Sequence, residues 1–74
     1  MIELLYIHDT NEIEVISEYN LGFPEYYKFQ DLEVIDANER ELGVEIEYIL
    51  KRKNYPNIHI VFYPEGILND FWEE

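Results

Sequence analysis

Short runs in which apolar and polar residues alternate recur along the sequence, and this period of two most constrains the fold. Ile58, Ile60 and Phe62 are separated by single residues, so in an extended chain their side chains point to one face. This run is the clearest strand in the sequence, and Pro64 closes it. Ten Ile, four Val, seven Tyr and four Phe against one Ala, Ala37, favour strands over helices. We therefore expect a mainly β protein.

The first half of the sequence predicts a hairpin followed by a third strand. Residues 2–8 and 12–19 are expected to form two strands, because the Asp-Thr-Asn at residues 9–11 suits a tight turn. Residues 21–24, Leu-Gly-Phe-Pro, break the pattern. Residues 26–35 then form the predicted third strand.

Residues 39–53 fit two interpretations. As a strand, Val44, Ile46 and Tyr48 alternate with charged residues. As a helix, the same segment ends in a basic run that suits the negative end of the helix dipole, and the fold becomes α+β. We favour the strand because Gly43 in a helix interior costs about 1 kcal/mol.

The C-terminal tail is expected to form a short helix. Ile67, Leu68, Phe71 and Trp72 recur at helical spacing, so such a helix would cover one side of the sheet. The expected fold is a small antiparallel sheet of four or five strands with this C-terminal helix, in a single acidic domain of residues 1–74. The alternative is an α+β fold in which residues 39–53 are helical.

The sequence contains no Cys, which excludes both a disulfide framework and a thiolate metal site and fits a reducing compartment. No run approaches the roughly 20 apolar residues that span a bilayer. The N-terminus lacks the basic flank of a signal peptide. We therefore expect a cytoplasmic protein.

The charge balance is strongly acidic and restricts the choice of partner. Seventeen Asp and Glu against five Lys and Arg give a formal net charge of −12. Such a charge disfavours direct contact with nucleic acid or with an anionic membrane. The expected partner is a basic protein.

No residue pattern indicates catalysis or cofactor binding. His8 and His59 lack the spacing of a metal site, and Ser17 and Thr10 lie in no glycine-flanked nucleophile turn. The three glycines are too far apart to cradle a phosphate. We expect neither an enzyme nor a cofactor nor a metal site.

Acidic residues at alternate strand positions are the most distinctive candidates for a binding surface. Residues two apart in a strand lie about 6.6 Å from each other on one face, so acidic pairs form rows that imitate neighbouring phosphates. Tyrosines accompany these rows, and Tyr is favoured at protein interfaces. The competing interpretation is that outward Glu residues simply solvate a half-buried sheet. The predicted partner-binding residues are Glu12, Glu14, Glu45, Glu47, Tyr48 and Tyr63.

The leading functional hypothesis is an inhibitor that docks a carboxylate-rich face on a basic site, such as the nucleic-acid channel of a nuclease or another defence enzyme. In size and charge alone, the chain is similar to uracil-DNA glycosylase inhibitors, anti-restriction proteins and anti-CRISPR proteins. Two alternatives stay open. One is an immunity protein that neutralises a cognate toxin, and the other is a structural subunit that forms homo-oligomers.

Overall fold

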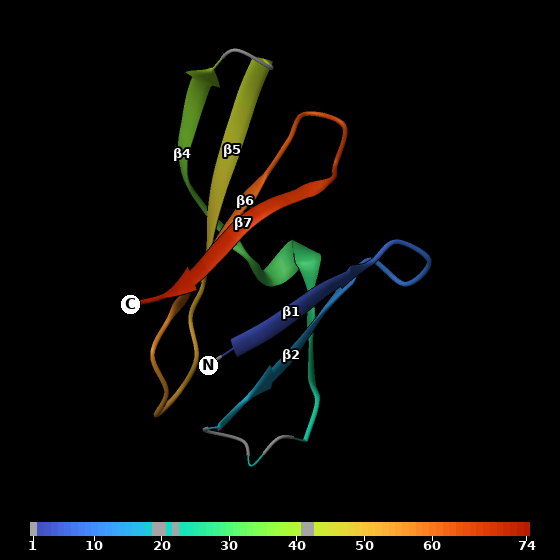
Figure 1. Ribbon diagram of the computed structural model, residues 1–74, viewed down its shortest axis with the longest axis vertical. Coiled ribbons are helices and arrows are strands. Elements are labelled where there is room, and N and C mark those ends of the chain that lie inside the picture. The colour runs from blue at the N-terminus through green and yellow to red at the C-terminus, as the bar shows by residue number, and fades with distance from the viewer. Residues whose placement is uncertain (1, 19–20, 22, 41–42) are drawn as a thin grey trace. The chain divides into compact units, whose positions relative to one another are not determined.

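The chain forms two antiparallel β-sheets (Figure 1). It divides into two compact units, Met1–Asp31 and Leu32–Glu74, and each is built around one sheet. The mainly β, antiparallel fold predicted from the sequence is confirmed, although the described residues form seven strands in two sheets and not four or five strands in one. The single domain of residues 1–74 stays a prediction. The computed structural model describes residues 2–18, 21, 23–40 and 43–74, with 37–40, 43 and 44 described by their backbone alone.

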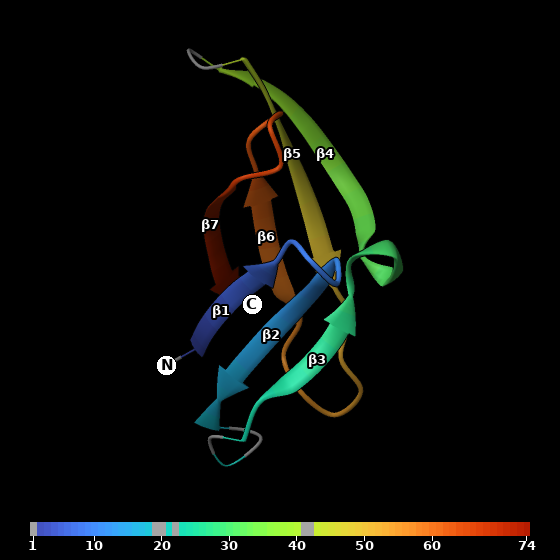
Figure 2. The ribbon, with the colours of Figure 1, turned by 90° about the vertical axis from the view of Figure 1, so that its right-hand side faces the viewer.

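The first sheet has the strand order β1-β2-β3, with β1 at Ile2–Ile7, β2 at Glu12–Ser17 and β3 at Glu25–Lys28 (Figure 2). The predicted hairpin of the first two strands is confirmed. Its turn depends on Asn11, whose φ of 56° lies in the left-handed region that Asn tolerates better than most residues. The Asn11 side chain also accepts a hydrogen bond of 2.5 Å from the Tyr6 hydroxyl, which fixes the turn to β1.

The predicted third strand, residues 26–35, is interrupted. After β3, the 3-10 helix η2 (Phe29–Asp31) intervenes, and a new strand starts only at Glu33. The Phe29 N–H donates to the Asn11 carbonyl at 3.0 Å, beyond the last residue of β3 that pairs with β2. This bond holds the start of η2 beside the β1–β2 turn and continues the β2–β3 register by one residue. The 3-10 helix then takes the chain out of the ladder.

The second sheet has the strand order β4-β5-β6-β7 and is antiparallel throughout (Figures 1 and 2). Within residues 39–53, β5 is a strand, so the helical alternative is wrong. Residues 46–50 of β5 pair with a strand on each side, and Gly43 at the start of β5 pairs with Arg40 of β4. These pairings satisfy backbone groups that a helix would otherwise have to satisfy internally. The strands are β4 (Glu33–Arg40), β5 (Gly43–Leu50), β6 (Ile58–Phe62) and β7 (Leu68–Glu73).

The predicted C-terminal helix is wrong, because this segment forms β7. Two hydrogen bonds of 2.9 Å close the turn before it, from the Tyr63 N–H to the Ile67 carbonyl and from the Gly66 N–H to the Tyr63 carbonyl. Gly66 has a φ of 84°, which a residue without Cβ adopts freely. The turn returns the tail along β6, where Phe71 pairs with Ile60. Helical spacing of apolar residues carries no information about such a partner strand.

The core of the second unit follows the alternation seen in the sequence. Ile58 and Ile60 are fully buried, and Phe62 and Leu50 nearly so. Tyr48 packs edge-on against Phe62, with ring centroids 5.8 Å apart. In the part of the chain that the structure describes, no helix is long and apolar enough to cross a bilayer.

Candidate functional site: an acidic sheet face

The register of the first sheet gathers acidic and apolar side chains on one face. Glu14 lies opposite Leu5 on β1 and opposite Tyr26 on β3. Directly opposed residues of antiparallel strands project to the same face, so these three form one row across the sheet. Neighbouring rows extend the same surface. This surface, here termed the acidic face, carries Glu3, Leu5, Ile7, Glu12, Glu14, Ile16, Tyr26 and Lys28.

The acidic face carries solvent-exposed side chains, whereas the β2 residues on the other face of the same sheet are buried. Leu5 is 56% exposed and Tyr26 53% exposed. On the other face of β2, Ile13 and Val15 are fully buried. The exposed apolar groups therefore lie among carboxylates and are not part of the core.

The carboxylates of Glu12 and Glu14 on β2 raise the pKa of Tyr26. Hydrogen bonding to Glu14 raises the pKa of the Tyr26 phenol above its ordinary value, and the negative charge of Glu14 raises it further. The charge of Glu12 adds a smaller effect in the same direction. Tyr26 therefore keeps its proton and remains a hydrogen-bond donor on a negatively charged surface.

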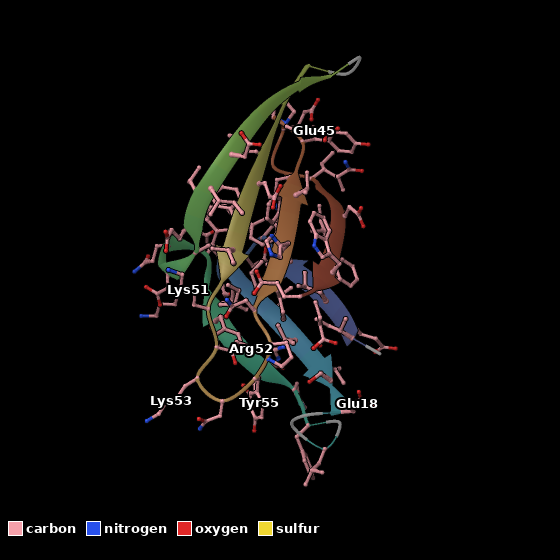
Figure 3. The ribbon with its side chains drawn as sticks, turned by 90° about the vertical axis from the view of Figure 1, so that its left-hand side faces the viewer. Glu18, Glu45, Lys51, Arg52, Lys53 and Tyr55 are labelled. Carbon is pink, nitrogen blue, oxygen red and sulfur yellow. The ribbon has the colours of Figure 1, made fainter. Side chains whose placement is uncertain are left out.

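The second predicted row, Glu45 with Glu47, lies on β5 but differs from the first. Glu45 is 7% exposed and sits on the upper part of β5 in Figure 3. Glu47 accepts a 2.8 Å hydrogen bond from Nδ1 of His59. These two carboxylates are thus largely buried or engaged within the second unit, whereas Glu12 and Glu14 are half-buried on a face that also carries the exposed side chains of Leu5 and Tyr26.

His59 contacts three other residues of the second unit, and the sequence did not predict these contacts. Its Nδ1 meets Glu47, its Nε2 lies 3.0 Å from Glu74, and its ring stacks on Trp72. Hydrogen bonds to Glu74 and then to Glu47 raise the pKa of the imidazole, because each ring nitrogen needs a proton to donate. These carboxylates lie 15 and 12 positions away along the chain, so no local spacing signals them.

The two tyrosines predicted to bind a partner also belong to the second unit. Tyr48 alternates with Glu47 along β5, so its side chain projects to the opposite face, where it packs on Phe62. Tyr63 is half-buried, directly after β6. Neither tyrosine therefore belongs to the sheet that carries Glu12 and Glu14. The tyrosine directly opposite Glu14 is Tyr26, which was not predicted from the sequence.

The basic run of residues 51–53 lies on the connection between β5 and β6 (Figure 3). Lys51 forms an exposed ion pair of 2.8 Å with Glu33. Arg52 has a side chain only 2% exposed and donates to the Glu73 carboxylate at 3.1 Å and to the Pro56 carbonyl at 2.9 Å. Arg52 is therefore an internal contact of the second unit, whereas the exposed Lys51–Glu33 pair contributes little to its stability.

Among the residues that the structure describes, no group of three or more His, Cys, Asp or Glu is arranged to hold a metal ion. Comparison with known proteins found no match to a protein-family model, to a curated protein or to a solved structure. Any functional inference therefore rests on the geometry of the chain itself.

Proposed function

We propose that this chain is a small cytoplasmic binding protein that docks its acidic face on the basic, nucleic-acid-binding site of a partner protein and inhibits it by occupancy. One observation carries the proposal. The register of β1, β2 and β3 places Glu3, Glu12 and Glu14 on a single exposed face with Leu5 and Tyr26.

The composition of the acidic face is suited to protein binding. Exposed apolar side chains lose contact with water when a partner covers them, and this supplies a favourable free energy that a purely charged surface lacks. Tyr26 offers a large ring with few rotatable bonds and a hydroxyl, a combination that is enriched at interfaces. The three carboxylates of the face then select partners that are basic.

Inhibition would follow from competition for the same cations. Carboxylates of the acidic face pair with Lys and Arg side chains that otherwise hold phosphates, so nucleic acid and this chain exclude each other. The net charge of −12 attracts a basic partner over distances of about 10 Å at 0.1 M salt and about 30 Å at 0.01 M salt. The charge thus speeds association, and the apolar contacts slow dissociation.

The test is capture of proteins from a native lysate on the immobilised chain, with elution in a salt gradient. We expect a basic nucleic-acid-binding protein to be retained at low salt and released as the salt rises. After purification, that protein should lose its binding to a nucleic acid when this chain is added. Glu12→Lys with Glu14→Lys should weaken capture by at least about tenfold, because two attractive contacts become repulsive.

A second charge reversal controls for net charge. Asp31 and Glu65 are exposed acids outside the acidic face. Asp31→Lys with Glu65→Lys changes the total charge as much as the first variant and should leave capture nearly intact. Equal loss in the two variants would show that charge alone is responsible and would contradict a specific face.

Size measurement in solution separates this function from that of a structural subunit. An inhibitor of the proposed kind binds its partner as a small acidic species. A stable homo-oligomer that retains no basic protein would contradict the proposal.

A further inference from the structure

The acidic face contains a pocket on its β1–β2 side. The pocket has a volume of about 240 Å³ and is lined by Glu3, Leu4, Leu5, Glu14 and Ile16. Glu3 lies opposite Ile16, and Leu5 lies opposite Glu14, so the two carboxylates stand at diagonal corners of this group. Diagonal neighbours in an antiparallel pair are about 7–8 Å apart. Leu5 and Ile16 share the face with the two carboxylates and supply the apolar part of the lining.

The volume of the pocket indicates the size of its occupant. Pockets for cofactors and drug-sized ligands measure roughly 300–1,000 Å³, so 240 Å³ lies below that range. Several water molecules of about 30 Å³ each would fill the same space. The pocket therefore suits a single long side chain better than a free ligand of cofactor size.

The lining indicates the chemistry of the occupant. A side chain that enters must have an apolar stem to cover Leu5 and Ile16 and a cationic end to meet Glu3 and Glu14. Lys and Arg both have such a stem. Arg has in addition a planar group with donors along several edges, which allows it to reach two separated carboxylates at once. Its weaker hydration makes transfer to a partly apolar pocket easier than for an ammonium group.

Tyr26 strengthens the preference for arginine. It lies opposite Glu14 on β3, next to the pocket, and is 53% exposed. A guanidinium group stacks on an aromatic ring more readily than an ammonium group does. An arginine in the pocket would thus have a carboxylate on two sides and a phenol ring nearby.

We infer that the pocket formed by Glu3, Leu5, Glu14 and Ile16 receives one arginine side chain of the basic protein partner. This inference rests on the proposed function and specifies the anchor residue of that interface. The arginine stem covers Leu5 and Ile16, and its guanidinium donates to the Glu3 and Glu14 carboxylates. In the partner's own function, the same arginine would contact a phosphate.

The direct test is NMR titration of the isotope-labelled full chain with three capped tripeptides, Gly-X-Gly, at low salt. X is arginine, lysine or citrulline, and citrulline has nearly the shape of arginine without its charge. We expect saturable shifts of the Leu5, Glu14 and Ile16 amide signals with the arginine peptide, weaker ones with lysine and none with citrulline. Equal binding of the lysine and arginine peptides, or no saturable shift with arginine, would overturn the inference.

Variants locate the binding to the pocket. Glu14→Gln should weaken the binding of the arginine peptide by about tenfold, because one of the two carboxylates is lost. Glu65→Gln removes an exposed acid elsewhere and should have no effect. Binding that survives in Glu14→Gln unchanged would place the peptide outside the pocket and overturn the inference.

A neutral substitution distinguishes failure of the pocket from failure of the proposed function. Leu5→Ser removes an apolar wall without a change of charge and should weaken capture of the basic partner. Ile67→Ser is the matched control, since Ile67 is 54% exposed against 56% for Leu5. If capture depends on Glu12 and Glu14 but is unaffected by Leu5→Ser, the arginine pocket is wrong while the docking face stands. If the arginine peptide binds at the pocket but no basic protein is captured, the proposed function fails and the pocket stands.

Discussion

The imidazole of His59 stacks on the indole of Trp72, with ring centroids 5.1 Å apart and ring planes 2° from parallel. The two residues are direct partners in the pairing of β6 with β7. The same imidazole meets Glu47 of β5 through one nitrogen and Glu74 through the other. His59 thereby links three strands and the residue after β7, so its protonation should affect the stability of the second unit.

The free energy of unfolding should decrease as the pH rises above about 6.5. The pKa of His59 is raised in the folded protein, first by Glu74 and then by Glu47, so folding favours the protonated form. Its contribution is complete below the unfolded pKa of about 6.5 and is lost as the pH rises through the higher folded value. The pKa of Glu74 is lowered by His59, so the contribution of Glu74 is lost only under acidic conditions, below about pH 4.5. Urea unfolding at a series of pH values measures both effects.

Two histidine variants test whether His59 causes this dependence of stability on pH. His59→Gln should flatten the decline above about pH 6.5, because the titrating group is gone. His8→Gln, in the exposed turn after β1, should leave the decline as it is in the natural sequence. A decline of equal slope in His59→Gln would show that another group causes it.

Arg52 should be the most sensitive position of the basic run. Its side chain is 2% exposed, and it donates to Glu73 and to the Pro56 carbonyl, with its guanidinium 5.6 Å from the centre of the Tyr55 ring. Arg52→Met keeps much of the volume but leaves the carboxylate and the carbonyl without this donor. Removal of one partner of a buried ion pair costs about 3 kcal/mol.

The matched control for Arg52 is its exposed neighbour. Lys53→Met should change the free energy of unfolding by less than about 0.5 kcal/mol, as is usual for surface substitutions. Chemical denaturation of the two variants makes the comparison. Similar small losses in both would mean that Arg52 contributes no more than a surface charge.

The elements that could be predicted from the sequence are those whose signal is local. β6 was evident because Ile58, Ile60 and Phe62 alternate, and the β1–β2 hairpin because a turn segment separates two apolar runs. β7 was missed because Ile67, Leu68, Phe71 and Trp72 also fit a helical period. Its strand conformation depends on pairing with β6, which no local pattern encodes.

The residues of the candidate site also fall into those with a local sequence signal and those without one. Glu12 and Glu14 were predicted from their spacing within one strand, and the structure places them on one exposed face. Leu5 and Tyr26 were missed because their place beside Glu14 depends on the register of three strands. The turn at residues 9–11 could have supplied half of that register, since it fixes which residues of β1 oppose those of β2. The contacts of His59 join residues far apart in the sequence, so no local pattern could have predicted them.

Replacement of Gly66 should destabilise the protein because of its positive φ and not because of steric overlap. Its φ is 84°, and a Cβ built there meets no atom within 4 Å, so sterically the site has room. Gly66→Ala should therefore lower the free energy of unfolding by about 1 kcal/mol through backbone strain. Gly66→Asn should cost less, because Asn enters the left-handed region more readily. Equal stability of all three proteins in urea would show that this turn imposes no positive φ.

The ionisation of Tyr26 reports directly on the register that builds the acidic face. Hydrogen bonding to Glu14, together with its charge, is the main cause of the raised phenol pKa, so Glu14→Gln should lower that pKa towards its ordinary value of about 10. An NMR titration of tyrosine ring carbons resolves Tyr26 from the other six tyrosines. Glu65→Gln removes one charge outside the acidic face and should leave the Tyr26 pKa in place. If Glu14→Gln also leaves it in place, Tyr26 and Glu14 are not neighbours, and the row that joins β1, β2 and β3 on this face does not exist in solution.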